Sequence, residues 1–255
     1  MMNPVILKIG GSVITEKGSE SKARRDEIDR ISQEIARFKA EADITLILVH
    51  GAGSFGHPQA MKWVNEGFNA RGAYLTHRSV KELNSMVLDS LTGAGVHALP
   101  VHPLSSCILE NGKIVEFQTG QIKLMLERGV VPVLHGDVVM DRIRGASVLS
   151  GDRIIPYLAP AMNASKIGAG SDVDGVLDNK GAVIKKITPQ SFVDIKQHIS
   201  GSGSTDVTGG MLGKVSELLE LSKSGINSRI FNASRKGMVS KFLYSEDIGT
   251  LIADK

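Results

Sequence analysis

The sequence contains almost no cysteine. Cys107 is the one cysteine among 255 residues, so the chain cannot form an intramolecular disulfide, which fits a reducing compartment. We interpret Cys107 as a buried packing residue rather than a nucleophile, because residues better suited to chemistry occur elsewhere in the chain.

Long apolar runs and a strong net charge are also missing. No uninterrupted apolar stretch approaches the ~20 residues that cross a bilayer, and the N-terminus lacks the charged region and long apolar core of a signal peptide. We therefore expect a cytoplasmic protein without a membrane partner. The formal net charge is only +3, and no basic face with interleaved aromatic residues occurs, so no nucleic-acid partner is expected.

Glycine, by contrast, is abundant, with 28 residues among the 255. The glycines gather in short clusters directly after apolar runs, which is typical of a ligand site at the carboxyl ends of a sheet. A P-loop of the GxxxxGK[ST] type is absent. Apolar runs alternate with segments of helical periodicity, and this alternation predicts an α/β fold with a mostly parallel sheet.

The first elements form a strand–helix–strand unit. A buried strand at 5–9, a helix at 26–40 and a strand at 44–49 place the glycine turns that follow both strands at the same sheet edge. Further strands are expected at 97–103, 130–134, 164–169, 229–232 and 250–253, a hairpin at 107–117, and a strand with a short helix within 182–200. Helices are expected at 80–91, at 122–126, from 151 and after the stretch 206–214 that opens the last one. A soft division near residue 163 separates an N-terminal lobe, 1–163, from a C-terminal lobe, 164–255, on one continuous sheet.

The stretch HGAGSFGH, from His50 to His57, is the most informative of the chain. A strand that ends in a glycine-rich turn points several backbone N–H groups at one place, and such a turn binds anions, above all where it opens a helix. His57 adds an imidazole whose charge responds near neutral pH. The pattern predicts a phosphate that is held by backbone amides and contacted by His57.

Three lysines lie close to glycine turns. Lys8 stands on the first strand just before 10–12, and a fixed ammonium beside backbone amides suits phosphoryl transfer. Lys214 opens a helix after a pair of glycines, and Lys17 follows the first strand in a polar segment. The ordinary alternatives are a lysine beside an unremarkable turn for Lys8 and solvated surface lysines for the other two.

Asp172 and Asp174 lie two residues apart. In an extended segment they share one face, where they could organise a Mg²⁺–nucleotide or orient Lys8 through a charge pair. The alternative is a polar turn capped by aspartates.

The other histidines lack metal-ligand spacing, so no metal site made by the protein is predicted. His135, which precedes a glycine at a strand end, could lie near the site. Surface or packing roles are expected for the rest, namely His77, His97, His102 and His198.

Six motifs occur in order between residues 8 and 214: KIGGS, HGAGSFGH, HGD, SGD, DVDGV and DVTGGMxGK. As a set they resemble the amino acid kinase superfamily, and the motif ending in His57 narrows the resemblance to its archaeal-type isopentenyl phosphate kinases. The resemblance covers nearly the whole chain. It implies an open αβα sandwich that binds ATP and an acidic acceptor at the carboxyl edge of the sheet.

The resemblance also implies an activity, namely the ATP-dependent phosphorylation of isopentenyl phosphate to isopentenyl diphosphate in isoprenoid biosynthesis by the alternative mevalonate pathway. Mg²⁺ would be held mainly through the nucleotide phosphates. The N-terminal lobe would bind the acceptor phosphate and the C-terminal lobe the nucleotide. Such kinases are commonly homodimers, so a homodimer is expected.

Individual roles follow from the matched motifs. His57 would hydrogen-bond the acceptor phosphate. The substrate and the transferring phosphoryl group would be surrounded by Gly53, Ser54 and Gly151. Negative charge on ATP and the transition state would be offset by Lys8, Lys17 and Lys214. The nucleotide would be bound by the amides of Gly10, Gly11 and Ser12 and framed by Ser171, Asp172, Asp174, Gly175, Gly209 and Gly210.

A prenyl tail needs an apolar pocket. We place it against four residues of the middle helix, although these residues could equally face the core: Val80, Leu83, Met86 and Val87.

One segment departs from the family pattern. Glycines at 168 and 170 interrupt the strand before Ser171 and are expected to loosen it, which bears on the nucleotide contacts more than on the acceptor site.

Two other functions remain open. One is a kinase of the same fold for another small anion, such as a phosphonate, an acyl amino acid or a nucleoside monophosphate, and a polar tail pocket would favour it. The other is a non-catalytic nucleotide-binding regulator, which would bind ATP without turnover and would not need Lys8.

Overall fold

The computed structural model describes residues 3–42, 44–61, 63, 67–199 and 210–255. Its main sheet has eight strands in the order β10–β12–β11–β9–β1–β2–β6–β3, and all neighbours are parallel except β11 and β12. The strands are β1 (Val5–Ile9), β2 (Leu46–His50), β3 (Ala98–Val101), β6 (Val131–His135), β9 (Lys166–Ser171), β10 (Lys186–Ile187), β11 (Ser228–Asn232) and β12 (Thr250–Ile252).

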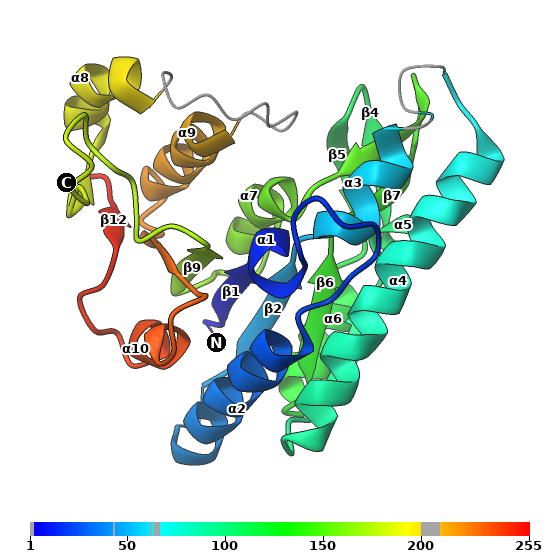
Figure 1. Cartoon of the computed structure of the whole chain (residues 1–255), viewed down its shortest axis with the longest axis horizontal. Coiled ribbons are helices and arrows are strands. Elements are labelled where there is room, and N and C mark those ends of the chain that lie inside the picture. The colour runs from blue at the N-terminus through cyan, green and yellow to red at the C-terminus, as the bar shows by residue number, and fades with distance from the viewer. Residues whose placement is uncertain (1–2, 43, 62, 64–66, 200–209) are drawn as a thin grey trace.

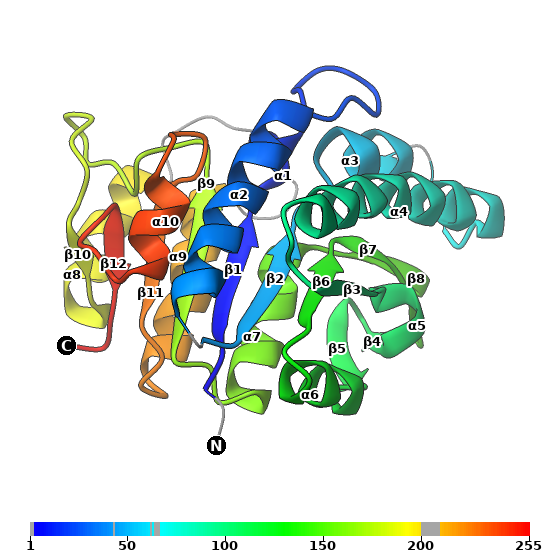
Figure 2. The same ribbon diagram turned by 90° about the horizontal axis from the view of Figure 1, so that it is seen from below.

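Helices cover both faces of this sheet (Figures 1 and 2). Alternate side chains of β1 serve the two faces, since Val5 and Leu7 join one buried cluster and Ile6 the other. The first cluster lies under α2 (Arg25–Glu41), α4 (Ala70–Gly93) and α10 (Met238–Leu243). The second lies under α6 (Gly120–Glu127), α7 (Gly151–Ala161), α8 (Pro189–Ile199) and α9 (Gly210–Ser222). The expected open αβα sandwich is confirmed.

A second, smaller sheet stands beside β6. It has four strands in the order β5–β4–β7–β8, namely β4 (Cys107–Glu110), β5 (Lys113–Phe117), β7 (Asp137–Asp141) and β8 (Gly145–Leu149), with the short α5 (Pro103–Ser106) before β4. The β4–β5 hairpin was expected, whereas the β7–β8 hairpin and α10 were not. Because β7 follows β6 after Gly136 alone, the chain passes between the two sheets at the carboxyl end of β6.

The glycines of β9 do not loosen that strand, contrary to expectation. Gly168 and Gly170 are buried in a regular parallel strand between β1 and β11. A side-chain carbon at Gly168 would lie 2.5 Å from the Phe242 ring, and one at Gly170 would lie 2.7 Å from the Ala233 methyl group. The two glycines therefore let the following elements pack directly against the sheet.

The order of the strands reverses at β1, which marks one edge of the sheet as a candidate ligand site. Beside β1 stand β2, which follows it, and β9, which comes much later; ligands of open α/β sheets bind at such a switch point. Two helices begin at this edge, α1 (Gly11–Ile14) after β1 and α3 (Gly53–Met61) after β2. No helix in the described ranges is long and apolar enough to span a bilayer.

Candidate active site

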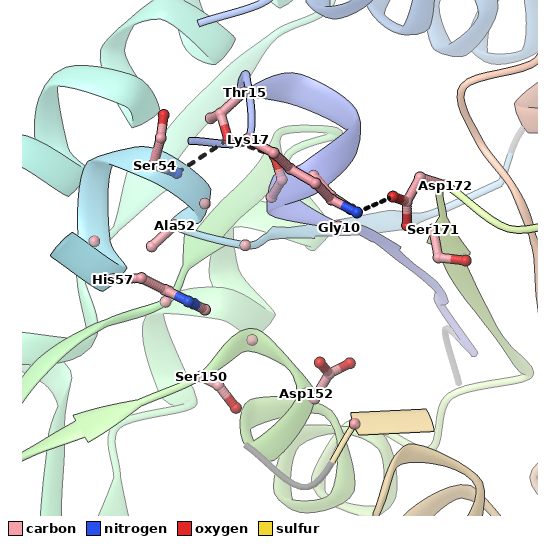
Figure 3. Close-up of a pocket in the computed structure, with 18 of the residues that line it drawn as sticks. Gly10, Thr15, Lys17, Ala52, Ser54, His57, Ser150, Asp152, Ser171 and Asp172 are labelled. Carbon is pink, nitrogen blue, oxygen red and sulfur yellow. Dashed lines mark hydrogen bonds and ion pairs between the residues drawn. The ribbon is translucent and has the colours of Figure 1, made fainter. Parts of the chain in front are cut away.

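A cavity of about 1260 Å³ opens at the carboxyl edge of the main sheet (Figure 3). Its walls come from the turns after β1, β2, β6 and β9 and from the first turns of α7 and α9. Fifteen of the residues expected in the site line it: Lys8, Gly10, Gly11, Ser12, Lys17, Gly53, Ser54, His57, Val80, Gly151, Ser171, Asp172, Gly175, Gly210 and Lys214.

Backbone amides of three helix N-termini border this cavity. The first-turn N–H groups of α1, α3 and α7 have no acceptor within their own helices, and the helix dipoles add positive potential there. The turns after β1 and β2 touch, because a side-chain carbon at Gly11 would lie 2.3 Å from the Gly53 nitrogen. Thr15 joins them further, since its Oγ1 accepts from Ser54 N at 3.0 Å and donates to Gly11 O at 2.8 Å. The cradle can therefore hold phosphate oxygens.

Lys8 is fixed by a carboxylate across the cavity floor. The Lys8 side chain is only 6% exposed, and its Nζ lies 2.9 Å from Asp152 Oδ1 and 3.1 Å from Oδ2. Burial would raise the pKa of Asp152, but the charges of Lys8 and Lys214 lower it. The carboxylate thus stays ionised, holds the Lys8 ammonium and feels the charge of Lys214, which lines the same cavity.

Asp152 was missed as a partner of Lys8. Of the roles left open for Asp172 and Asp174, the charge pair with Lys8 is not the one in the structure. Asp172 binds Lys17 at 2.7 Å, whereas Asp174 lies outside the cavity lining and bonds to Asn232 at 2.9 Å and Arg235 at 2.6 Å. The SGD motif could have identified Asp152 as the partner of Lys8. It places an acidic residue in the first turn of α7, next to the end of β1.

Lys17 reaches across the mouth of the cavity. Its exposed side chain makes an ion pair with Asp172 from the turn after β9 (Figure 3). Burial would raise the pKa of Asp172, but hydrogen bonds from Lys17, the Asp172 backbone and Ser12 lower it. The pair links the polar segment after α1 to the C-terminal half of the sheet.

His57 projects from α3 into the open space of the cavity (Figure 3). The residue is exposed, so its imidazole is accessible to a ligand. Ser54, one turn earlier on α3, is buried, and its hydroxyl bonds to the backbone of Lys22. The Ser54 hydroxyl therefore takes part in hydrogen bonds within the protein.

The four expected tail-pocket residues separate into two groups. Val80 lines the cavity. Leu83, Met86 and Val87 pack instead against the core beneath α4, outside the cavity lining, as in the alternative that the sequence left open. Sequence reasoning missed other residues that line the cavity, namely Thr76 and the apolar residues Pro58, Ala60, Met61, Val148 and Leu149.

Gly209, which was expected to frame the nucleotide, lies outside the described residues.

Within the described ranges, no group of three or more His, Cys, Asp or Glu side chains is arranged to hold a metal ion.

A buried polar cluster lies directly under the glycine turns. The rings of His50 and His135, at the ends of neighbouring strands β2 and β6, stack with centroids 5.6 Å apart. His102 Nδ1 lies 2.8 Å from His135 Nε2, and His77 contacts the Asp137 carboxylate at 3.0 Å. His135 thus lies beneath the cavity at Gly136, and His77 and His102 have polar partners rather than plain surface or packing roles.

The cluster makes the fold sensitive to acid. Burial lowers the pKa of His50 to about 4 and that of His135 to about 3. Between these values and the ordinary value near 6.5, the unfolded chain binds more protons than the folded one, so stability falls as pH falls. We expect a melting temperature that is steady above pH 7 and decreases from pH 6.5 toward 4. His50→Asn should flatten this decrease, whereas His97→Asn, at an exposed histidine, should not; an unchanged slope in His50→Asn would contradict the assignment.

The chain belongs to the amino acid kinase family, whose model matches residues 3–232. It resembles one kind of kinase in particular. Isopentenyl phosphate kinase of Methanocaldococcus jannaschii is 37% identical over 97% of this chain and 97% of its own length. That of Methanothermobacter thermautotrophicus is 38% identical over 98% of this chain and 99% of its own. X-ray structures of isopentenyl phosphate kinase match with a TM-score of 0.82 and 34% identity over 98% of this chain and 100% of theirs.

Proposed function

We propose that this protein is an ATP-dependent kinase that phosphorylates isopentenyl phosphate to isopentenyl diphosphate in isoprenoid biosynthesis. The observation that carries the proposal is a single cavity that combines an amide cradle, His57 and the paired lysines Lys8 and Lys214. The named relatives, which match along nearly their full length, support it. A homodimer remains a prediction.

The reaction brings two polyanions together. A phosphate oxygen of the acceptor attacks the γ-phosphorus of ATP, the bond to the bridging oxygen breaks, and ADP leaves. The protein has mainly to position both groups and offset their charge. His57 would donate to the acceptor phosphate, while Lys8, held by Asp152, and Lys214 would offset charge that develops on the transferring phosphoryl group and on ADP.

The residues present fit Mg²⁺ that is bound through nucleotide phosphates rather than by a protein cage. Mg²⁺ commonly keeps several waters and takes one or two carboxylates plus phosphate oxygens. Asp152 and Asp172 line the cavity, but each is paired with a lysine. Bound Mg²⁺ would supply further neutralisation of the phosphate charge.

An apolar wall beside His57 favours a prenyl tail. Ala60 and Met61 follow His57 on α3, Val80 approaches Gly56 of the same helix, and Val148 lines the same cavity. A hydrocarbon tail gains free energy from leaving water. A phosphonate, an acyl amino acid or a nucleoside monophosphate would instead leave polar groups against this wall. The lining thus supports a prenyl phosphate over the other small anions.

Tail selectivity can be tested with a matched pair of substitutions on one helix. Val80→Ala is expected to raise the kcat/KM ratio of geranyl phosphate to isopentenyl phosphate about tenfold, because removing methyl groups from an apolar pocket changes discrimination by ~1–3 kcal/mol. Val87→Ala makes the same change two turns along α4, in the core, and should lower stability without changing the ratio. Equal ratios in both variants would remove Val80 from the tail pocket.

The function itself is tested by an acceptor screen with radiolabelled ATP. We expect label transfer to isopentenyl and dimethylallyl phosphates and little or none to glutamate, acetylglutamate, fosfomycin and nucleoside monophosphates. Transfer to one of these competitors alone would favour the other kinase. Tight ATP binding with transfer to no acceptor would favour the regulator.

A further inference from the structure

Two buried histidines stand in equivalent places beneath the phosphate cradle. His50 ends β2 and His135 ends β6, at paired register positions, and each precedes a glycine that lines the cavity. Both are essentially inaccessible to solvent, at 1% and 0% exposure. The reaction outlined above uses neither of them. Burying a polar side chain costs free energy unless it is hydrogen-bonded, so the partners of both rings matter.

Each ring makes the same bond to the glycine that follows it. His50 Nδ1 lies 3.1 Å from Gly51 O, and His135 Nδ1 lies 2.9 Å from Gly136 O. A carbonyl oxygen can only accept, so both Nδ1 atoms carry the proton. In neutral rings the Nε2 atoms must then be acceptors.

A group that can donate lies at each Nε2 position. Asn84 Nδ2 lies 3.0 Å from His50 Nε2, and His102 Nδ1 lies 2.8 Å from His135 Nε2. A proton on either Nε2 would face another N–H donor. This repulsion disfavours the charged imidazolium, as burial also does. The burial-lowered pKa values of both histidines agree with this arrangement. Side chains of α4 and of the segment before α5 thus set the tautomers.

The bond to Gly51 orients an amide that faces the cavity. In a planar trans peptide the C=O and the next N–H point in opposite directions. The Gly51 carbonyl is held toward His50, so the Ala52 N–H points away from the buried ring. Ala52 lines the cavity (Figure 3), and its N–H donates to no residue in the described part of the chain.

His135 holds the carbonyl of Gly136, which lies near the start of α7. A side-chain carbon at Gly136 would lie 3.6 Å from both Ala52 N and Gly151 N. Gly136, whose carbonyl His135 holds, therefore lies beside two amides, one from the turn after β2 and one from the start of α7.

We propose that His50 and His135 are positioning residues for phosphoryl transfer. As neutral Nδ1–H tautomers, fixed by Asn84 and His102, they hold the Gly51 and Gly136 carbonyls so that the Ala52 and Gly151 amides bind the transferring phosphoryl group. This inference rests on the proposed function for the identity of that group. It gives the buried imidazoles of His50 and His135 a role in shaping the phosphate cradle.

The tautomers can be measured without any substrate. Imidazole ¹⁵N NMR of the wild-type protein at pH 7.5 should show a protonated Nδ1 and an unprotonated Nε2 for both His50 and His135. A proton on Nε2 of either ring would overturn the proposal. This measurement stands whether or not any variant folds.

Two substitutions separate positioning from support of the fold. Asparagine retains an N–H donor on the atom that follows Cγ, as in the Nδ1 of histidine, whereas leucine retains only apolar volume. We expect His50→Leu to lower kcat about 30-fold with the KM for ATP within about twofold, since a misplaced group can cost ~10²-fold. His50→Asn should stay within about threefold of the wild type. If kcat instead follows the melting temperatures of the two variants, the role is structural and the proposal fails.

A binding readout separates this inference from the proposed function. In ¹H–¹⁵N spectra, the Ala52 amide should shift when inorganic phosphate is added to the wild type or His50→Asn, but not to His50→Leu. A wild-type shift in His50→Leu would overturn the positioning role. If the wild type phosphorylates no prenyl phosphate, the proposed function fails, while the Ala52 response still decides this inference.

Discussion

Replacement of Lys8 by methionine is expected to lower kcat by a factor of about 10³ or more. A fixed cation beside transferring phosphate contributes on the scale of other charge-stabilising groups, ~10²–10⁵-fold. Lys8 is nearly buried and held by Asp152, so neither water nor a mobile side chain can replace its charge. Steady-state kinetics with isopentenyl phosphate measures the effect, and Lys123→Met, at an exposed lysine of α6, is the matched control.

The loss must be separated from damage to the fold. Lys8→Met leaves the Asp152 carboxylate without its nearest counter-charge, which destabilises a partly buried acid. The double variant Lys8→Met/Asp152→Asn removes both charges, so we expect its melting temperature to recover while kcat stays low. Activity that recovers together with stability would mean that Lys8 serves the fold. Near-normal kcat in Lys8→Met would favour the non-catalytic regulator.

Local patterns predicted most of the fold because several buried strands, β1, β2 and β6 among them, are almost entirely apolar runs. The five residues of β1 and of β6 are all buried, and the glycine turns after β1, β2 and β6 meet at one edge, as parallel strands require. The β7–β8 hairpin escaped prediction although its turn carries a local signal, since the Asp141 carboxylate accepts from the Ile143 and Arg144 amides at 2.9 and 3.0 Å. No local spacing shows that the same carboxylate also accepts from the Asn111 and Gly112 amides at 3.0 and 2.7 Å.

The sequence predicted those parts of the site that are formed by one contiguous motif. It did not predict contacts between residues that are far apart in the chain. The stretches 10–12 and 51–57 carry their own geometry, so their place in the cavity followed from the sequence. Lys8 and Asp152 are 144 positions apart, and Asp172 and Asp174, which lie still farther along the chain but share a regular spacing, were the more visible candidates. Val80 and Val87 share one helical face, but only the three-dimensional structure shows that the cavity reaches the first and stops before the second.

His57→Ala is expected to lower kcat/KM for isopentenyl phosphate by about 10²–10³-fold, on the scale of losing one donor that stabilises developing charge. The KM for ATP should change little, because His57 extends from α3 on the acceptor side. The exposed ring has no packing role that alanine would remove, so the melting temperature should hold.

A graded series identifies what the imidazole supplies. His57→Gln retains an N–H donor near the position of Nε2 but never carries charge, so its kcat/KM should lie between those of His57→Ala and the wild type. The ordering follows if both the hydrogen bond and the positive charge reduce repulsion between the acceptor phosphate and ATP, since charge-assisted hydrogen bonds are roughly twice as strong as neutral ones. His97→Ala, at another exposed histidine, provides the control. Wild-type kinetics in His57→Ala would remove the acceptor assignment and leave the amide cradle to be explained by the nucleotide alone.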